Sequence, residues 1–463
     1  MVHIYKLNGF NIVVDSNSGT IHVVDNVAYE IIKNYNKNTQ EEIINKLKER
    51  FSLREITEAF DEIEYMKKEG MLFSKDEFEN IAKKWEKQDS RVKALCLNVA
   101  HICNLRCKYC FASQGNYKTK EMLMPFEIAR KAVEFLIENS GTLKNIEIDF
   151  FGGEPLLNFD VIRRTVDYAR SIENKYDKKF FFTITTNGTL LTDEIIDYLN
   201  ENMGNVVISI DGRKEIHDAM RCYPDGRGSY DDIVPKAQKL VRGRKGKQYY
   251  IRGTFTAKNL DFTNDVKHLA DLGFKEISLE PVTGKGEEWS ITEKMLPRIF
   301  EEYERLADYL IESWKRGKDI KFYHFNLNIF EGPCFYKRLT GCGAGYEYLA
   351  VTPTGDIYPC HQFVGLEEFK LGDLLKGIER KDFSQYFRES HIYSKEKCKN
   401  CWAKFYCSGG CHADAYFSTG DIRGTNNLYC ELQKKKIECA IMLQIIKKLG
   451  TGCKLPIKEM KLS

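Results

Sequence analysis

The fifteen cysteines of this chain are the sequence feature that most limits how it can fold. All of them follow residue 95 of 463; three lie within Cys103 to Cys110, and ten lie between Cys334 and Cys453. The number is odd, and a chain of this length can bury a hydrophobic core without cross-links. We therefore expect thiols that bind metal rather than disulfides.

The overall composition is that of an ordinary globular protein. Hydrophobic residues make up 43% and charged residues 30% of the chain, and its length corresponds to about three domains. The formal net charge of +3 leaves no basic field that would indicate nucleic-acid binding. No apolar run reaches the roughly 18 residues of a membrane-spanning helix, and residues 1–6 lack the pattern of a secretory signal. We expect a cytoplasmic protein.

Residues 1–73 contain no Cys and predict a small α+β domain. Short β-rich runs separated by turn signals are followed by helical periodicity. The runs cover residues 3–7, 11–15 and 20–24, and the helices cover residues 27–35, 40–51 and 53–69. Three short strands and three helices indicate a winged-helix-like fold. Residues 74–92 are rich in charge and indicate a partly helical linker.

Between residues 93 and 325, apolar runs alternate with amphipathic helical segments. The runs that predict strands cover residues 94–100, 144–151, 180–186, 204–210, 248–256 and 274–282. Six strand–helix units predict an α/β fold, a partial (β/α)6 barrel somewhat shorter than the eight-unit barrel of about 250 residues. Residues 326–463 are rich in Cys and Gly, have weak periodicity and predict a metal-folded domain that ends in a helix from about Glu431.

Three thiols follow directly after the first barrel strand. Cys103, Cys107 and Cys110 can hold a four-iron cluster and leave one iron without a protein ligand, whereas ordinary electron-transfer clusters have four Cys ligands. A zinc site is the alternative, but zinc requires a fourth ligand, for which His101 is the neighbouring candidate. The spacing favours the cluster over zinc.

This Cys spacing, with Tyr109 before the last Cys, resembles the signature of radical S-adenosylmethionine (SAM) enzymes. Gly152-Gly153-Glu154-Pro155 resembles the family's GGEP element, which receives the amino group of the methionine part of SAM. Glycine lets the backbone approach a ligand, and Glu supplies the anion for an ammonium group. The resemblance implies further SAM contacts at later strands, mostly at their carboxyl ends, where barrel enzymes build their sites: Asn187, Ser209, Asp211, Arg221 and Leu279.

The C-terminal cysteines are similar to the seven-Cys motif of the SPASM branch of that family. By resemblance, auxiliary cluster I is held by Cys342, Cys360 and Cys411, with Cys334 as an additional candidate, and cluster II by Cys398, Cys401, Cys407 and Cys430. A zinc ribbon would account for one CxxC pair but not for seven or eight thiols. The resemblance therefore implies SAM and three [4Fe-4S] clusters as cofactors.

Two further features concern the substrate. In anaerobic sulfatase maturases an acidic base follows the second Cys of the motif, but in this chain His361 occupies that position. Three roles are open for His361: another base, a hydrogen-bonding neighbour of the cluster, or a structural residue. Residues 1–73 resemble the domain with which peptide-modifying enzymes bind a leader peptide as an added strand. DNA reading is disfavoured, because the charged residues of the helix at 53–69 are mostly acidic.

Over nearly the whole chain, the resemblance is closest to thioether-forming maturases of Cys-rich SCIFF peptides, of the sactipeptide and ranthipeptide type. It implies a 5′-deoxyadenosyl radical that takes a hydrogen from a Thr carbon of a ribosomal precursor peptide, and a Cys sulfur that bonds to that carbon. It also implies an external electron donor such as flavodoxin or ferredoxin. A sulfatase or quinohaemoprotein maturase on the same scaffold, a non-catalytic iron–sulfur electron-transfer protein and a zinc-bearing regulator remain alternatives.

Overall fold

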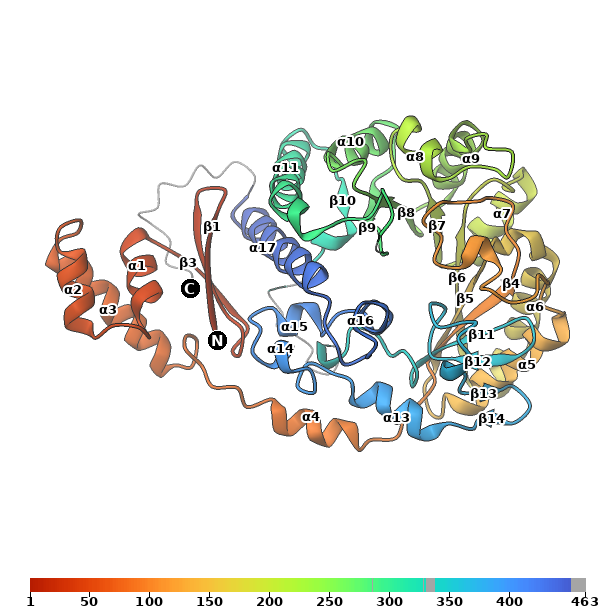
Figure 1. Ribbon diagram of the computed structural model, residues 1–463, viewed down its shortest axis with the longest axis horizontal. Coiled ribbons are helices and arrows are strands. Elements are labelled where there is room, and N and C mark those ends of the chain that lie inside the picture. Colours follow the sequence, from red (N-terminus) through yellow and green to blue (C-terminus); the bar gives the residue numbers. More distant parts are fainter. Residues whose placement is uncertain (285, 328, 330–337, 451–463) are drawn as a thin grey trace.

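The computed structural model describes residues 1–284, 286–327, 329 and 338–450 and has three connected parts (Figure 1). A three-stranded antiparallel sheet and three helices form the N-terminal part. Its elements are β1 (Val2–Leu7), β2 (Phe10–Asp15), β3 (Thr20–Val24), α1 (Asn26–Asn34), α2 (Gln40–Leu47) and α3 (Leu53–Lys68). All strands and helices that the sequence predicts before residue 74 are present.

A parallel sheet with helices on its outer face forms the barrel. The strands are β4 (Ala94–Ala100), β5 (Asn145–Gly152), β6 (Lys179–Thr186), β7 (Asn205–Ser209), β8 (Gln248–Phe255), β9 (Glu276–Pro281) and β10 (Lys321–Phe322). The helices are α5 (Phe126–Asn139), α6 (Phe159–Tyr176), α7 (Asp193–Asn202), α8 (Lys214–Met220), α9 (Tyr230–Gly243), α10 (Thr263–Asp271) and α11 (Leu296–Lys315). The predicted partial barrel is confirmed. Each of the six predicted strands begins and ends within two residues of the corresponding observed strand.

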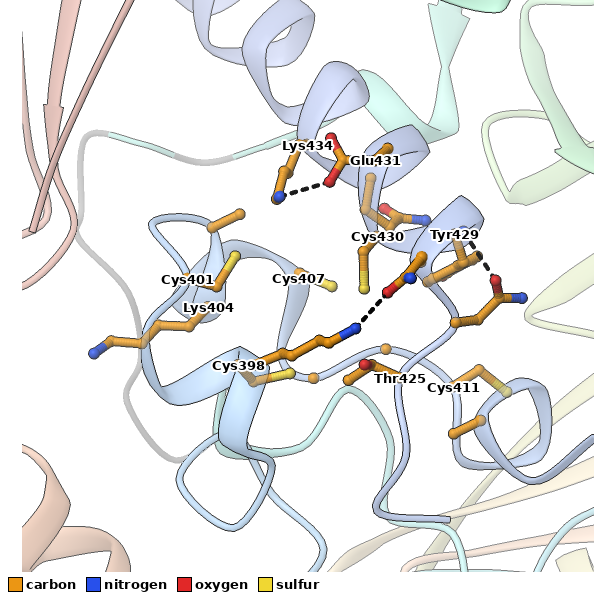
Figure 2. A pocket seen from close by; sticks show the side chains of 18 of the residues that line it. Cys398, Cys401, Lys404, Cys407, Cys411, Thr425, Tyr429, Cys430, Glu431 and Lys434 are labelled. Atoms are coloured by element: carbon orange, nitrogen blue, oxygen red, sulfur yellow. Dashed lines mark hydrogen bonds and ion pairs between the residues drawn. The ribbon is translucent and has the colours of Figure 1, made fainter. Parts of the chain in front are cut away.

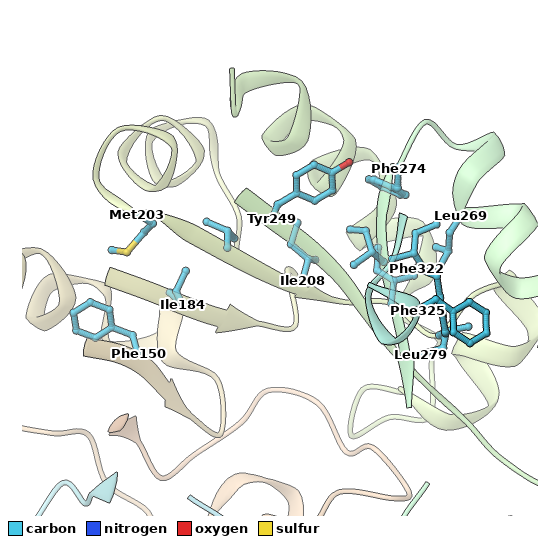
Figure 3. Close-up of a cluster of buried hydrophobic side chains, with 14 of the residues drawn as sticks. Phe150, Ile184, Met203, Ile208, Tyr249, Leu269, Phe274, Leu279, Phe322 and Phe325 are labelled. Carbon is cyan, nitrogen blue, oxygen red and sulfur yellow. The ribbon is translucent and has the colours of Figure 1, made fainter. Parts of the chain in front are cut away.

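Alternation along the strands separates the helix-covered face from the inner face. Phe150, Ile184 and Ile208 are fully buried and belong to the core under the helices (Figure 3). The residues between such positions, among them Ser209 and Arg252, are half-buried or exposed. Because successive side chains of a strand point to opposite faces, these residues line the inside of the barrel. The inner face is therefore accessible to a ligand.

The barrel sheet continues into the Cys-rich region, a continuation that the weak periodicity there does not predict. β11 (Tyr348–Val351) pairs parallel with β4, on the side opposite β5. Three short antiparallel strands follow: β12 (Asp356–Tyr358), β13 (Gly372–Asp373) and β14 (Gly377–Ile378). Because β11 hydrogen-bonds to β4, the barrel and the Cys-rich region share one 11-stranded sheet.

A long C-terminal helix connects all three parts. The Cys-rich region contains α13 (Lys381–Glu389), α14 (Glu396–Lys399), α15 (Lys404–Cys407), α16 (His412–Thr419) and α17 (Asn427–Leu449). α17 packs against α11 of the barrel and β1 of the N-terminal sheet (Figure 1). His3 Nε2 lies 2.9 Å from Glu438 Oε1 of α17, and the His3 ring stacks on Trp402 at 3.9 Å between centroids. In the described part of the chain, none of the helices is both long and apolar enough to span a membrane.

The charged segment 74–92 is held against the Cys-rich region. It contains the helix α4 (Glu79–Glu86). Arg388 of α13 donates hydrogen bonds of 2.8 Å to the carbonyl oxygen of Trp85 and the hydroxyl of Ser90. The Trp85 ring also meets the Tyr346 ring edge-on at 5.8 Å. These contacts fix the segment between the N-terminal part and the barrel along its length.

Candidate functional site

The loop after β4 carries the first three thiols and is shaped by glycines. A Cβ added to Gly153 would lie 2.1 Å from the carbonyl oxygen of Ile102, and one added to Gly115 would lie 2.6 Å from the Cβ of Cys103. Gly152 has a φ of 134°, and its Cβ would lie 2.3 Å from a backbone oxygen at the end of β4. Only glycine allows these backbone segments to approach so closely. The GGEP element therefore defines the path of the thiol loop.

Glu154 is fully buried beside this loop and accepts three hydrogen bonds. Its Oε1 accepts from the Thr186 hydroxyl at 2.7 Å and the Leu156 N–H at 3.0 Å, and its Oε2 accepts from the Asn187 N–H at 2.7 Å. Burial raises the pKa of Glu154 to about 7, although the hydrogen bonds oppose the rise. An ammonium group beside this carboxyl would favour its ionised form, so the site is suited to a cation.

Asn187 connects Glu154 to the first thiol. Its side-chain Nδ2 donates to Asn104 Oδ1 at 2.9 Å and to the sulfur of Cys103 at 3.8 Å. The Thr189 N–H donates to Asn187 Oδ1 at 3.0 Å and fixes the orientation of the amide. Hydrogen bonds to sulfur are one of the means by which a protein sets the potential of an iron–sulfur cluster.

A buried ion pair lies beside the second thiol. Arg221 Nε donates to Asp211 Oδ1 at 3.0 Å, and another nitrogen of the same guanidinium lies 4.0 Å from the sulfur of Cys107. The Tyr109 hydroxyl donates to the second oxygen of Asp211, and the Arg221 guanidinium lies 5.3 Å from the centre of the Tyr109 ring. Asp211 therefore orients both Arg221 and Tyr109 next to the thiol loop.

Ser209 and Leu279 lie farther along the sheet. Ser209 is the last residue of β7, on the inner face and in register with Arg252 of β8. Leu279 is fully buried in β9, with its side chain against Gly253. Ser209 and Leu279 therefore lie away from the thiol loop. The other five predicted contacts lie around the loop: Tyr109, Glu154, Asn187, Asp211 and Arg221.

The surroundings of the three thiols fit an iron–sulfur cluster. All the described cysteines are free of disulfides. Burial raises the pKa of Cys103 to about 12 and that of Cys107 to about 11, and Arg221 opposes the rise at Cys107. A bound metal would stabilise the thiolates that burial disfavours. No three His, Cys, Asp or Glu side chains of the described residues are close enough to hold a single ion; a four-iron cluster instead takes thiolates spread around it.

The C-terminal thiols gather in the two sets that the family resemblance implies. Burial and then the neighbouring thiolates of Cys411 and Cys342 raise the pKa of Cys360. In the second set, burial and then Cys398, Cys430 and Cys401 raise the pKa of Cys407 to about 12. Such mutual repulsion indicates that the members of each set lie near one another. Cys334, the additional candidate, lies outside the described residues.

A cavity of about 230 Å³ separates the thiols of the second set. Figure 2 shows the sulfur atoms of Cys398, Cys401, Cys407 and Cys430 pointing into a common space between α15 and the start of α17. Cys411 of the first set lies at the border of the same cavity. Two thiol sets are therefore close neighbours in the Cys-rich region.

A buried lysine stands next to both sets. Lys395 is 1% exposed, and its Nζ donates to the carbonyl oxygen of Gly409 at 2.9 Å. Burial raises the pKa of Cys342 in the first set and of Cys398 in the second, and the charge of Lys395 lowers both. The sequence contains no signal for this residue, because a Lys in a polar, Cys-rich segment is normally exposed.

His361 links the first thiol loop to the Cys-rich region. Its ring lies 4.9 Å from the Phe151 ring and 5.5 Å from the Phe111 ring, and its Nδ1 is 3.4 Å from the Tyr348 hydroxyl oxygen. Phe111 directly follows Cys110. Burial lowers the pKa of His361 to about 4, so the imidazole is neutral at pH 7.

Comparison with family models identifies two regions of the chain. The model of the Radical SAM superfamily matches residues 97–299, which include the thiol loop and most of the barrel. The model of the iron–sulfur cluster-binding domain SPASM matches residues 342–402. The two matches include the three thiols of the first loop and four of the C-terminal thiols, Cys342, Cys360, Cys398 and Cys401.

Three relatives are similar over much of their length. An uncharacterized protein of Methanocaldococcus jannaschii is 32% identical over 283 residues, which are 59% of this chain and 87% of that protein. The cysteine-type anaerobic sulfatase-maturating enzyme of Clostridium novyi is 28% identical over 361 residues, 73% of this chain and 91% of its own. The radical SAM cyclopropyl synthase TigE of Paramaledivibacter caminithermalis is 25% identical over 448 residues, 90% of this chain and 89% of its own.

Two solved structures share the fold. Native anSMEcpe with bound AdoMet has a TM-score of 0.64 and 23% identity, and the match covers 77% of this chain and 99% of that chain. Streptococcus suis SuiB bound to precursor peptide SuiA has a TM-score of 0.53 and 16% identity, and covers 92% and 98%. At these identities the likeness shows the fold alone.

Proposed function

Since the chain belongs to the radical SAM superfamily and carries a SPASM iron–sulfur region, we propose that it matures a ribosomally synthesised, Cys-rich peptide by joining a Cys sulfur to a Thr carbon. It is a radical SAM enzyme related to anaerobic sulfatase-maturating enzymes and to the cyclopropyl synthase TigE. A peptide substrate is supported by SuiB, which has the same fold and binds a precursor peptide.

The observation that carries the proposal is the open edge of the N-terminal sheet. β1 packs against α17, whereas β3 ends the sheet, and no strand of the described residues lies beyond it. The side chains at the start of β3 are fixed, since the Thr20 hydroxyl and His22 Nε2 both bond to the carbonyl oxygen of Met71. A strand held in this way presents free backbone groups to which an extended leader peptide can add.

The residues of the thiol loop would hold the cofactors. SAM at a four-iron cluster on Cys103, Cys107 and Cys110 supplies, when bound, a carbon-centred radical, and clusters on the C-terminal thiols accept an electron. Glu154 would offer its buried carboxyl to the amino group of SAM, and Arg221, oriented by Asp211, would offer a guanidinium. The chain's own task is to bind, orient and exclude water.

Each sulfur–carbon bond removes two hydrogens from the peptide. One leaves carbon as a hydrogen atom, the other leaves the Cys thiol as a proton, and the remaining electron passes to the enzyme and then to an external acceptor. His361 directly follows Cys360, but burial lowers its pKa to about 4, so the imidazole is a weak acceptor for this proton, which we expect to pass to solvent. An external donor such as flavodoxin or ferredoxin supplies the electron that starts the reaction.

The second candidate function is sulfatase maturation, which the relative from Clostridium novyi supports. His361 argues against this function, because sulfatase maturases, by resemblance, have an acidic proton acceptor at the position after the second Cys of the motif. The two candidates differ in substrate, so a single set of peptides separates them.

The test is co-expression with a small Cys-rich peptide encoded beside this gene, followed by mass spectrometry. Each bridge should lower the peptide mass by two hydrogens and protect one Cys from alkylation. The triple variant of Cys103, Cys107 and Cys110 to Ala should form no bridge and no 5′-deoxyadenosine, whereas Cys439→Ala, a buried thiol outside all three sets, should behave as wild type.

Two results would contradict the proposal. One is an unmodified peptide together with a sulfatase fragment whose Cys is oxidised. The other is unchanged turnover in the presence of excess leader peptide alone, because a leader that binds at β3 must compete with the full precursor.

A further inference from the structure

The inner face of β8 carries a charge that the proposed reaction does not use. Arg252 is in register with Ser209 of β7 and Ser278 of β9. Its neighbour Ile251 is fully buried under the helices. Since side chains alternate along a strand, Arg252 points into the barrel, where it is exposed.

Glu280, an acid whose charge is felt by Arg252, already has partners. Glu280 of β9 lies with its Oε1 3.3 Å from His324 Nε2 and its Oε2 3.7 Å from Lys436 Nζ. Lys436 comes from α17 and has a side chain that is only 3% exposed. Burial disfavours the charge of Glu280, but His324, Lys436 and Arg252 together hold its pKa below the usual value. Glu280 and Lys436 therefore neutralise each other.

Arg252 remains as a surplus positive charge. Among the ion pairs of the described residues, Glu280 pairs with His324 through one carboxylate oxygen and with Lys436 through the other, and no ion pair includes Arg252. Because Arg252 is exposed on the inner face of the barrel, its guanidinium is accessible to an anion that enters there.

We propose that Arg252 binds a carboxylate of the peptide substrate inside the barrel. This inference rests on the proposed function, which brings a peptide to that place. A guanidinium group matches a carboxylate with two parallel, charge-assisted hydrogen bonds. The group recognised would be an Asp or Glu side chain, or a terminal carboxylate, of the segment that enters the barrel.

A second carboxylate could in principle reach the barrel, that of SAM. Arg221 already stands at the thiol loop, paired with Asp211 and next to Cys107. Arg252 lies on a different strand, three residues before the end of β8. Because Arg221 already presents a guanidinium at the thiol loop, we assign Arg252 to the peptide, and the experiment separates the two sources.

The first experiment needs no peptide, so it decides about Arg252 even if the proposed function fails. Trifluoroacetate is titrated into the iron-loaded enzyme and its 19F line width is recorded, with trifluoroethanol as the neutral counterpart. Arg252→Gln should reduce the broadening of trifluoroacetate only, Arg252→Lys should restore part of it, and Arg316→Gln, an exposed Arg at the end of α11, should leave it unchanged. Equal broadening in wild type and Arg252→Gln would overturn the proposal.

The second experiment uses the precursor peptide and a set in which each acidic residue is replaced by its amide. Arg252→Gln should raise KM about tenfold to a hundredfold, the range of a charge-assisted hydrogen bond. The peptide in which the recognised acidic residue is replaced by its amide should raise the KM of the wild-type enzyme by the same factor. The same peptide should not raise the KM of Arg252→Gln any further. If instead SAM affinity falls as much as peptide affinity, Arg252 serves SAM and the inference is wrong. Iron content and circular dichroism of each variant establish that it is folded.

Discussion

Replacing Gly153 with Ala tests whether backbone packing at the end of β5 shapes the thiol loop. The added Cβ would lie 2.1 Å from the carbonyl oxygen of Ile102 and 2.5 Å from its carbon. Both are backbone atoms, so no side-chain rotation relieves the contact, which is about 1 Å closer than van der Waals packing allows. Ile102 directly precedes Cys103, so the displacement reaches the first thiol.

The cost follows from the contacts that must break. Gly153 N–H donates to the carbonyl oxygen of Ala100 at 2.7 Å, and Glu154 N–H donates to that of Ile102 at 2.9 Å. Losing both hydrogen bonds costs about 2 kcal/mol, and the overpacking costs about 1–3 kcal/mol more. We expect a loss of roughly 3–5 kcal/mol in the free energy of local opening.

Hydrogen exchange of residues 94–102 measures this opening, and iron analysis measures the consequence. Gly153→Ala should lose the iron of the first thiol set and the cleavage of SAM, while the iron of the C-terminal sets stays. Gly204→Ala is the matched control, because its Cβ would meet its nearest atom at 3.6 Å, an ordinary contact. Wild-type exchange and iron content in Gly153→Ala would refute the reasoning.

Three further predictions follow from the packing, from one carboxyl and from the thiol sets. His3→Ala removes the stack on Trp402 and the contact with Glu438, and should lower the free energy of unfolding by about 1–2 kcal/mol in chemical denaturation; an unchanged midpoint would show that β1 and α17 are not coupled. Burial raises the pKa of Asp149 from 3.8 to about 7, so the folded state keeps a proton that the unfolded state has released. Stability from this group falls as pH rises from about 4 to 7, and Asp149→Asn should flatten that fall relative to wild type. Cys342→Ala and Cys398→Ala should each remove a separate share of iron, and a double variant that loses no more than one of them would mean a single shared site.

Elements with strong periodicity were predictable from the sequence, and short strands with distant partners were not. The barrel strands β5, β6 and β7 alternate buried and open positions over five to eight residues, which is a clear local signal. β13 has two residues and β11 has four, too few for periodicity, and the partner of β11 is in a different predicted domain. α17 begins at Asn427 rather than near Glu431, because the Asn426 side chain accepts a hydrogen bond from the Tyr429 N–H and caps an earlier first turn.

The candidate site shows the same limit. Cys spacing and the Gly-Gly-Glu-Pro run are local patterns, so they indicated which thiols and which carboxyl matter. The pairing of Asp211 with Arg221, the position of Lys395 between two thiol sets and the unpaired charge of Arg252 depend on the packing of strands and loops far apart in sequence. A single Lys or Arg in a polar segment carries no local sign of burial.

The pairing of β11 with β4 has a consequence for synthesis of the chain on the ribosome. β4 begins at Ala94 and its neighbour β11 at Tyr348, so the barrel strands emerge long before the strand that covers their first edge. Synthesis proceeds from the N-terminus at about 5–20 residues per second. For roughly ten seconds or more, the nascent protein therefore exposes an apolar strand with unpaired backbone groups, a template for aggregation that a chaperone bound near the ribosome would have to cover.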